Sequence, residues 1–173
     1  ISRFLAVLHS DIDVVSVELS RQVIQCFSKF FNPLQHNMTI ENEAALTWLK
    51  SSSNRQATDW LVCDVYQHHA DSFQKRVELL SALVDNLQLN ACLTINLPDL
   101  DDHEVNLCLT ILKQLQNSHQ IIYFHIPRYL NIVIHLLPNH WQITRLKKRS
   151  KSTYLPLWQY YRWKKYFAHH IQA

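Results

Sequence analysis

The 173-residue sequence contains no glycine, although average usage of about 7% predicts roughly 12. Glycine is the default residue where a helix end or a tight turn needs positive φ, and where a backbone must approach a phosphate closely. The sequence therefore excludes a P-loop and a glycine-rich dinucleotide fingerprint. Two explanations stay open. Either the chain avoids glycine, or glycines have been lost from this sequence, in which case every spacing below is a lower bound.

Charge is separated along the chain. All 14 acidic residues lie at or before Glu104, where they accompany 7 basic residues and give a net charge of −7. Residues 105–173 carry 10 Lys and Arg and no acid, a net charge of +10. Because clustered cations raise the local potential, this half is predicted to bind an anionic surface.

The bulk composition indicates a cytoplasmic protein with one sizeable core. Hydrophobic residues make up 47% of the chain, and no apolar run reaches the ~18 to 20 residues that span a bilayer. The start, Ile1-Ser2-Arg3-Phe4, does not read as a signal peptide. The cysteines show no paired spacing and lie in apolar segments, so we expect four reduced core residues. They are Cys26, Cys63, Cys92 and Cys108.

Hydrophobic periodicity predicts strands that alternate with helices over residues 1–137. The expected strands are Arg3–Leu8, Met38–Ile40, Trp60–Val65, Ala91–Leu97 and Ile121–Ile126. The expected helices are one with Val15, Leu19, Val23, Cys26 or Phe27, and Phe30 on its buried face, Glu43–Lys50, Asp71–Leu87, and one that starts at Asp101. This alternation predicts an α/β fold with a mostly parallel five-stranded sheet, helices on both faces, and ligands at the carboxyl ends of strands.

Residues 138–173 form a basic, aromatic C-terminal segment with a predicted amphipathic helix from Leu157 to Ile171. Lys and Arg displace counterions from a nucleic-acid backbone, and aromatic rings stack on bases. We therefore predict anion contacts, to nucleic acid above all. The residues concerned are Arg145, Lys147, Lys148, Arg149, Lys151, Trp158, Arg162, Lys164 and Lys165.

Three other roles for this segment stay open. Its aromatic face, with Tyr160, Trp163 and Phe167, can pack on the α/β core. Its cations can pair with an acidic protein surface or with the acidic half of a second copy, which gives self-association. A basic amphipathic helix can also lie on a membrane with anionic headgroups.

Two strand residues carry a resemblance to a known family. Asp64 ends one predicted strand in Leu61-Val62-Cys63-Asp64-Val65, and Thr94 lies in the next in Leu93-Thr94-Ile95. With the five strand and helix pairs, this resembles the receiver domains of two-component signalling. The resemblance implies that Asp64 accepts a phosphoryl group and that Thr94 is the switch hydroxyl. It also implies Mg²⁺, with Asp11 and Asp64 as the metal ligands.

The sequence departs from the receiver pattern at two positions. Leu8 and His9 follow the first strand where the family has a pair of acids, and His125 stands where it has a lysine. We therefore expect an incomplete receiver-like domain that is used for binding.

A nuclease is the enzyme alternative. Asp11, Asp64, and Asp99 or Glu104 lie near successive predicted strand ends, where they could hold a metal that activates water against a phosphodiester.

A second metal cluster and a simpler role for the acids are also open. His68 and His69 with Asp64 and Asp71 could bind zinc or manganese. Strand-end acids also cap loops, and acids before a helix are explained by capping and by the helix dipole.

The sequence alone thus predicts a non-catalytic regulatory or scaffolding module that has no cofactor and binds nucleic acid or an acidic protein through its C-terminal segment. The alternatives are a metal-dependent nuclease and a protein- or membrane-interaction module in a signalling or secretion assembly.

Overall fold

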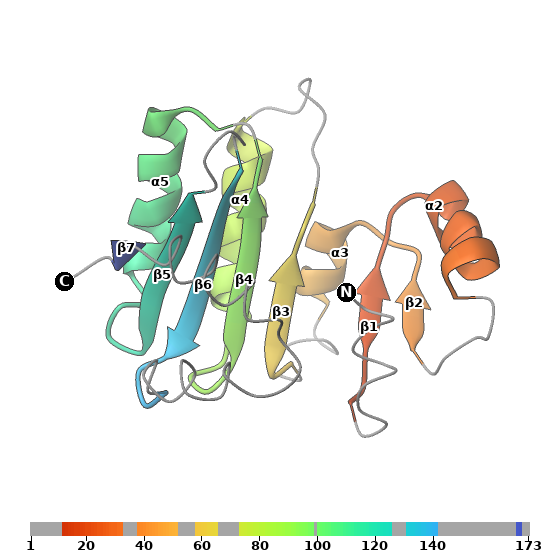
Figure 1. Ribbon diagram of the computed structural model, residues 1–173, viewed down its shortest axis with the longest axis horizontal. Coiled ribbons are helices and arrows are strands. Elements are labelled where there is room, and N and C mark those ends of the chain that lie inside the picture. Colours follow the sequence, from red (N-terminus) through yellow and green to blue (C-terminus); the bar gives the residue numbers. More distant parts are fainter. Residues whose placement is uncertain are drawn as a thin grey trace, which may run out of the picture. The chain divides into compact units, whose positions relative to one another are not determined.

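The computed structural model describes residues 12–32, 38–51, 58–65, 73–98, 100–125, 131–141 and the backbone of 169–170 (Figure 1). The chain divides into two compact units, Ile1–Arg55 and Gln56–Ala173. The strand expected at Arg3–Leu8 and almost all of the basic C-terminal segment lie outside the described residues.

The first unit holds a small parallel sheet and three short helical elements. Strands β1 (Val15–Val17) and β2 (Thr39–Glu41) pair in parallel. Helix α2 (Arg21–Cys26) continues into a π-helical turn, η1 (Phe27–Phe31), and α3 (Ala45–Lys50) follows β2.

The helix expected around Val15 is wrong, because this segment is strand β1. Its two valines are β-branched and favour extended backbone. The helix begins only after Ser20, whose side-chain oxygen accepts a hydrogen bond from the backbone N–H of Val23. The expected buried face is also wrong, since α2 buries no residue and Leu19 is 71% exposed.

The second unit is built on a mixed sheet with the strand order β3-β4-β6-β5-β7. The strands are β3 (Trp60–Cys63), β4 (Cys92–Leu97), β5 (His119–His125), β6 (Ile132–Pro138) and β7 (His169–His170). β3 and β4 are parallel, and the other neighbouring pairs are antiparallel.

The prediction of a mostly parallel five-stranded sheet is therefore wrong, although the coarser prediction of an α/β fold is confirmed. β6 was not predicted, and it lies between β4 and β5, antiparallel to both. Its direction follows from chain length, because only residues 126–131 separate it from β5. A parallel return needs a crossover of about a dozen residues, whereas a short connection makes an antiparallel pair.

Helices α4 (Phe73–Asp85) and α5 (Asp102–Lys113) lie side by side against one face of this sheet (Figure 1). Asp101 caps α5 through a reciprocal pair of hydrogen bonds with Glu104, as the sequence predicted. The centre of the core is fully buried and consists of Leu93, Ile95, Cys108, Leu112, Ile134 and Leu136.

The prediction of helices on both faces of the sheet is not met among the described residues of this unit, because α4 and α5 lie on the same face. On the opposite face, Trp60 and Val62 of β3 are 48% and 41% exposed.

Three of the four cysteines are buried as expected, whereas Cys26 is exposed. Burial raises the pKa of the Cys108 thiol to about 11. None of the helices in the described part of the chain is long and apolar enough to cross a membrane.

Candidate functional site

The carboxyl ends of β3 and β4 bring polar side chains together. Because the two strands are parallel, both end at the same edge of the sheet. Asp64 directly follows β3, and its Oδ1 accepts a hydrogen bond of 2.7 Å from Nδ2 of Asn96 on β4. The strand-end position predicted for Asp64 is therefore confirmed, and Asn96 is a neighbour that the sequence reasoning did not name.

A third strand adds to this cluster. Asn131 directly precedes β6, and its Nδ2 donates a hydrogen bond of 3.3 Å to Oδ1 of Asn96. Asp64 is exposed, whereas both asparagines are half-buried. We call Asp64, Asn96 and Asn131 the Asp64 row, since the three residues cross three neighbouring strands.

A second polar row lies further from this edge and consists of Trp60, Thr94 and His135. Trp60 Nε1 donates to Thr94 Oγ1 at 3.0 Å. Thr94 Oγ1 also lies 2.9 Å from Nδ1 of His135. A hydroxyl can donate one hydrogen bond and accept two, so the Thr94 oxygen can serve both Trp60 and His135. Burial lowers the pKa of His135, so its imidazole is neutral at pH 7.

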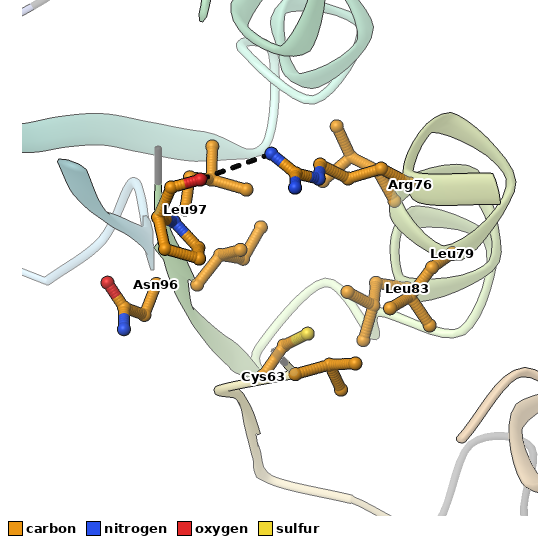
Figure 2. Close-up of a pocket in the computed structure, with 10 residues that line it drawn as sticks. Cys63, Arg76, Leu79, Leu83, Asn96 and Leu97 are labelled. Atoms are coloured by element: carbon orange, nitrogen blue, oxygen red, sulfur yellow. Dashed lines mark hydrogen bonds between the residues drawn. The ribbon is translucent and has the colours of Figure 1, made fainter. Parts of the chain in front are cut away.

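Both rows lie on the face of the sheet that α4 and α5 do not cover. Successive side chains of a strand alternate between faces, so Trp60 and Asp64 project on the same side of β3. Thr94 and His135 are directly paired across β4 and β6 and share that face. In Figure 2, the Asn96 side chain lies on the side of β4 away from α4.

A hollow lies between β4 and α4 (Figure 2). It has about 320 Å³ of space, part of it open to solvent, and its lining includes leucines of α4 together with Cys63 and Asn96. Arg76 crosses it and donates from Nη1 to the Pro98 carbonyl oxygen at 3.2 Å. Burial raises the pKa of the Cys63 thiol in its wall. With an inert thiol and a guanidinium that ties α4 to the end of β4, this hollow is structural.

The first unit has its own strand-end acid. Glu18 follows β1 and is half-buried, and its Oε1 accepts a hydrogen bond of 2.8 Å from the Ser20 backbone N–H. Asn42 follows the parallel strand β2 and donates from Nδ2 to the carbonyl oxygens of Glu18 at 3.0 Å and Leu19 at 2.9 Å. Arg21 Nε donates to the Asn42 side-chain oxygen at 3.1 Å. The two strand ends are thus tied together with the Glu18 carboxylate beside them.

Sequence reasoning missed Glu18 because it assigned the preceding valines to a helix. The signal that could have found it is an acid placed directly after a short run of β-branched residues.

Of the other predicted site residues, some lie in the described part of the chain and some lie outside it. Thr94 lies in β4, and its side chain contacts Trp60 and His135 of its own row. Glu104 is used in the cap of α5. No group of three metal-ligating side chains occurs among the described residues. Asp11, His68, His69, Asp71 and Asp99 lie outside those residues.

The predicted anion-binding residues also fall outside the part of the chain that the structure describes, so their role stays a prediction. They are Arg145, Lys147, Lys148, Arg149, Lys151, Trp158, Arg162, Lys164 and Lys165.

No protein-family model matches the sequence, and no curated protein is similar to it in sequence. Solved structures do match the fold. An rRNA methylase from Streptococcus thermophilus is 14% identical, with a TM-score of 0.55 and coverage of 78% of this chain and 77% of that one. Human methyltransferase-like protein 13 in complex with SAH is 16% identical, with a TM-score of 0.57 and coverage of 75% and 63%.

A probable spermidine synthase from Corynebacterium glutamicum gives a TM-score of 0.66 at 15% identity. The match covers 99% of this chain and 68% of that one. At such identities these likenesses establish a shared Rossmann-like α/β fold.

These structures correct three predictions. The resemblance to receiver domains is wrong, since the similar folds are methyltransferases and the sheet contains the antiparallel strand β6. The prediction of a non-catalytic signalling module is overturned by the same matches. The prediction of no cofactor is overturned because human methyltransferase-like protein 13 and a similar putative methyltransferase from Streptococcus mutans are both in complex with SAH, the product form of S-adenosylmethionine.

Proposed function

We propose that this chain is the catalytic domain of an S-adenosylmethionine-dependent methyltransferase that modifies a nitrogen of a nucleic acid. The observation that carries the proposal is Asp64, an exposed carboxylate at the carboxyl end of β3 with one oxygen fixed by Asn96. Open α/β sheets bind their ligands at this edge. The fold shared with methyltransferases supports the proposal.

The first unit, taken by itself, has a carboxylate that can bind a nucleoside. A carboxylate offers about four acceptor positions, and the Ser20 backbone N–H occupies one of those on Glu18. The remaining positions can accept hydrogen bonds from the two hydroxyls of a ribose. Since the chain has no glycine, side chains with a Cβ would line the rest of the binding loop.

When bound, the cofactor supplies a methyl group attached to an electron-poor sulfur. Asp64 would accept a hydrogen bond from the N–H of the substrate nitrogen, which directs the nitrogen lone pair away from the carboxylate. The negative charge of Asp64 would also stabilise the positive charge that develops on this nitrogen, and the carboxylate would take its proton.

Charge favours a nucleic-acid substrate over a polyamine. Residues 105–173 carry a net charge of +10, which attracts a polyanion and repels a polycation. The rRNA methylase among the similar structures supports the same choice. Synthesis of a polyamine is the second candidate, because the match to a probable spermidine synthase extends over 99% of the chain.

Transfer of a radiolabelled methyl group from S-adenosylmethionine to RNA or DNA tests the proposal. We expect labelling of nucleic acid and a loss of about 10²-fold or more in Asp64→Asn, the usual effect of removing an acid–base group. Asp59→Asn is the matched control, since Asp59 is an exposed acid at the opposite end of β3. Formation of spermidine from a diamine without labelling of nucleic acid would favour the second candidate, and full activity in Asp64→Asn would overturn the role of Asp64.

A further inference from the structure

We infer that Asn96 and Asn131 are positioning residues. They fix which oxygen of the Asp64 carboxylate is hydrogen-bonded within the protein and which one faces a ligand. This inference rests on the proposed function for its kinetic consequence, but not for its structural content. The observation behind it is the direction of the two hydrogen bonds in the Asp64 row.

The first step concerns Asn96. An ionised carboxylate can only accept hydrogen bonds, so Asn96 must turn its Nδ2 toward Asp64. Its Oδ1 then faces the other way. An asparagine amide alone can rotate by half a turn, which would place Oδ1 against the carboxylate and create repulsion in place of a bond.

The second step concerns Asn131, which removes this ambiguity. Its Nδ2 donates to Oδ1 of Asn96, and that bond is made only when Nδ2 of Asn96 faces Asp64. The row therefore has one direction, from Asn131 through Asn96 to Asp64. Both asparagines are half-buried, where a misdirected amide is costly because water compensates it poorly.

The third step links the row to substrate. Because Oδ1 of Asp64 is held by Asn96, the carboxylate is anchored through one oxygen and presents Oδ2 to the ligand. A fixed acceptor of this kind requires a donor hydrogen on the nucleophile, and its negative charge suits the positive charge that develops on a methylated nitrogen. We therefore assign an amino nitrogen as the substrate class, such as the exocyclic amino group of a base.

Reversal of the row tests the inference. In Asn131→Asp, the new carboxylate accepts hydrogen bonds only, so Asn96 should rotate to donate to it and turn Oδ1 toward Asp64. We expect kcat for methyl transfer to fall about 10-fold or more with KM for RNA little changed, because a charge-assisted hydrogen bond in the site is lost. In Asn131→Ala, Asn96 keeps its favourable direction, and the fall should be smaller. Asn106→Asp, at an exposed position on α5, is the control.

A readout without cofactor or RNA separates this inference from the proposed function. In the wild-type protein, the side-chain amide resonances of Asn96 should report its hydrogen bond to Asp64, and Asn131→Asp should shift them. If this holds and no methyl transfer occurs, the row stands and the proposed function fails. If methyl transfer occurs and Asn131→Asp leaves kcat and the Asn96 resonance unchanged, the inference is overturned.

Discussion

The two faces of the second unit's sheet are made by the same strands and are used differently. On the face under α4 and α5, Leu93 and Ile134 are completely buried and Ile95 is 1% exposed. On the other face, the neighbouring positions Thr94 and His135 bond to each other, and Trp60 is 48% exposed.

Within a single strand, one set of side chains therefore contributes to stability and the other set is available for chemistry. Side chains alternate with a period of two, so β4 can give one set of residues to the core and the other set to the two polar rows. Substitutions at adjacent positions should therefore have different effects on stability, and measuring them tests whether the two faces are independent.

The largest effect on stability is expected on the covered face. Leu93→Ala removes a fully buried side chain and should lower the free energy of unfolding by about 2 to 5 kcal/mol. Val62→Ala, at a position that is 41% exposed on the other face, should cost less than about 1 kcal/mol. Urea unfolding followed by circular dichroism measures both. Equal costs would mean that the polar face is also packed as a core.

A smaller effect is expected within the Thr94 row. Thr94→Val keeps the shape of the side chain but removes the oxygen that accepts from Trp60 and contacts His135. We expect a loss of about 1 kcal/mol, the usual net value of such hydrogen bonds. Thr110→Val is the control, because that exposed hydroxyl donates to a carbonyl of its own helix. If both variants are equally stable, the row contributes nothing to folding.

The same contrast explains how much the sequence could predict. Local signals sufficed for the covered face. The helical spacing of α4 and the Asp101–Glu104 capping box are read within one segment of the chain. The position of Asp64 at a strand end was likewise predicted from the residues around it.

The polar face depends on pairing between distant segments, which local patterns do not contain. Asn96 and Asn131 are 35 positions apart and meet only because β6 pairs with β4. β6 itself was missed, and so the row could not be assembled. Glu18 was hidden for a different reason, since an apolar run with helical spacing concealed the three residues of β1.

The smallest effect on stability concerns the charge state of His135. Burial lowers its pKa from the usual value of 6.5, so the folded protein keeps the imidazole neutral where the unfolded chain already binds a proton. The full stability is therefore present above pH 6.5, and the free energy of unfolding should fall as the pH drops below 6.5 toward the lowered value. His135→Asn should flatten this slope, as measured by urea unfolding between pH 5 and pH 7.5, chosen as roughly the histidine range.

The control is Thr110→Val, because Thr110 is an exposed residue of α5 without a titratable group and its replacement should leave the slope unchanged. If His135→Asn keeps the wild-type slope, other groups cause the pH dependence. The polar face would then be more open to water than the Trp60–Thr94–His135 contacts indicate, and the two faces would differ less in burial than in the kinds of residues they carry.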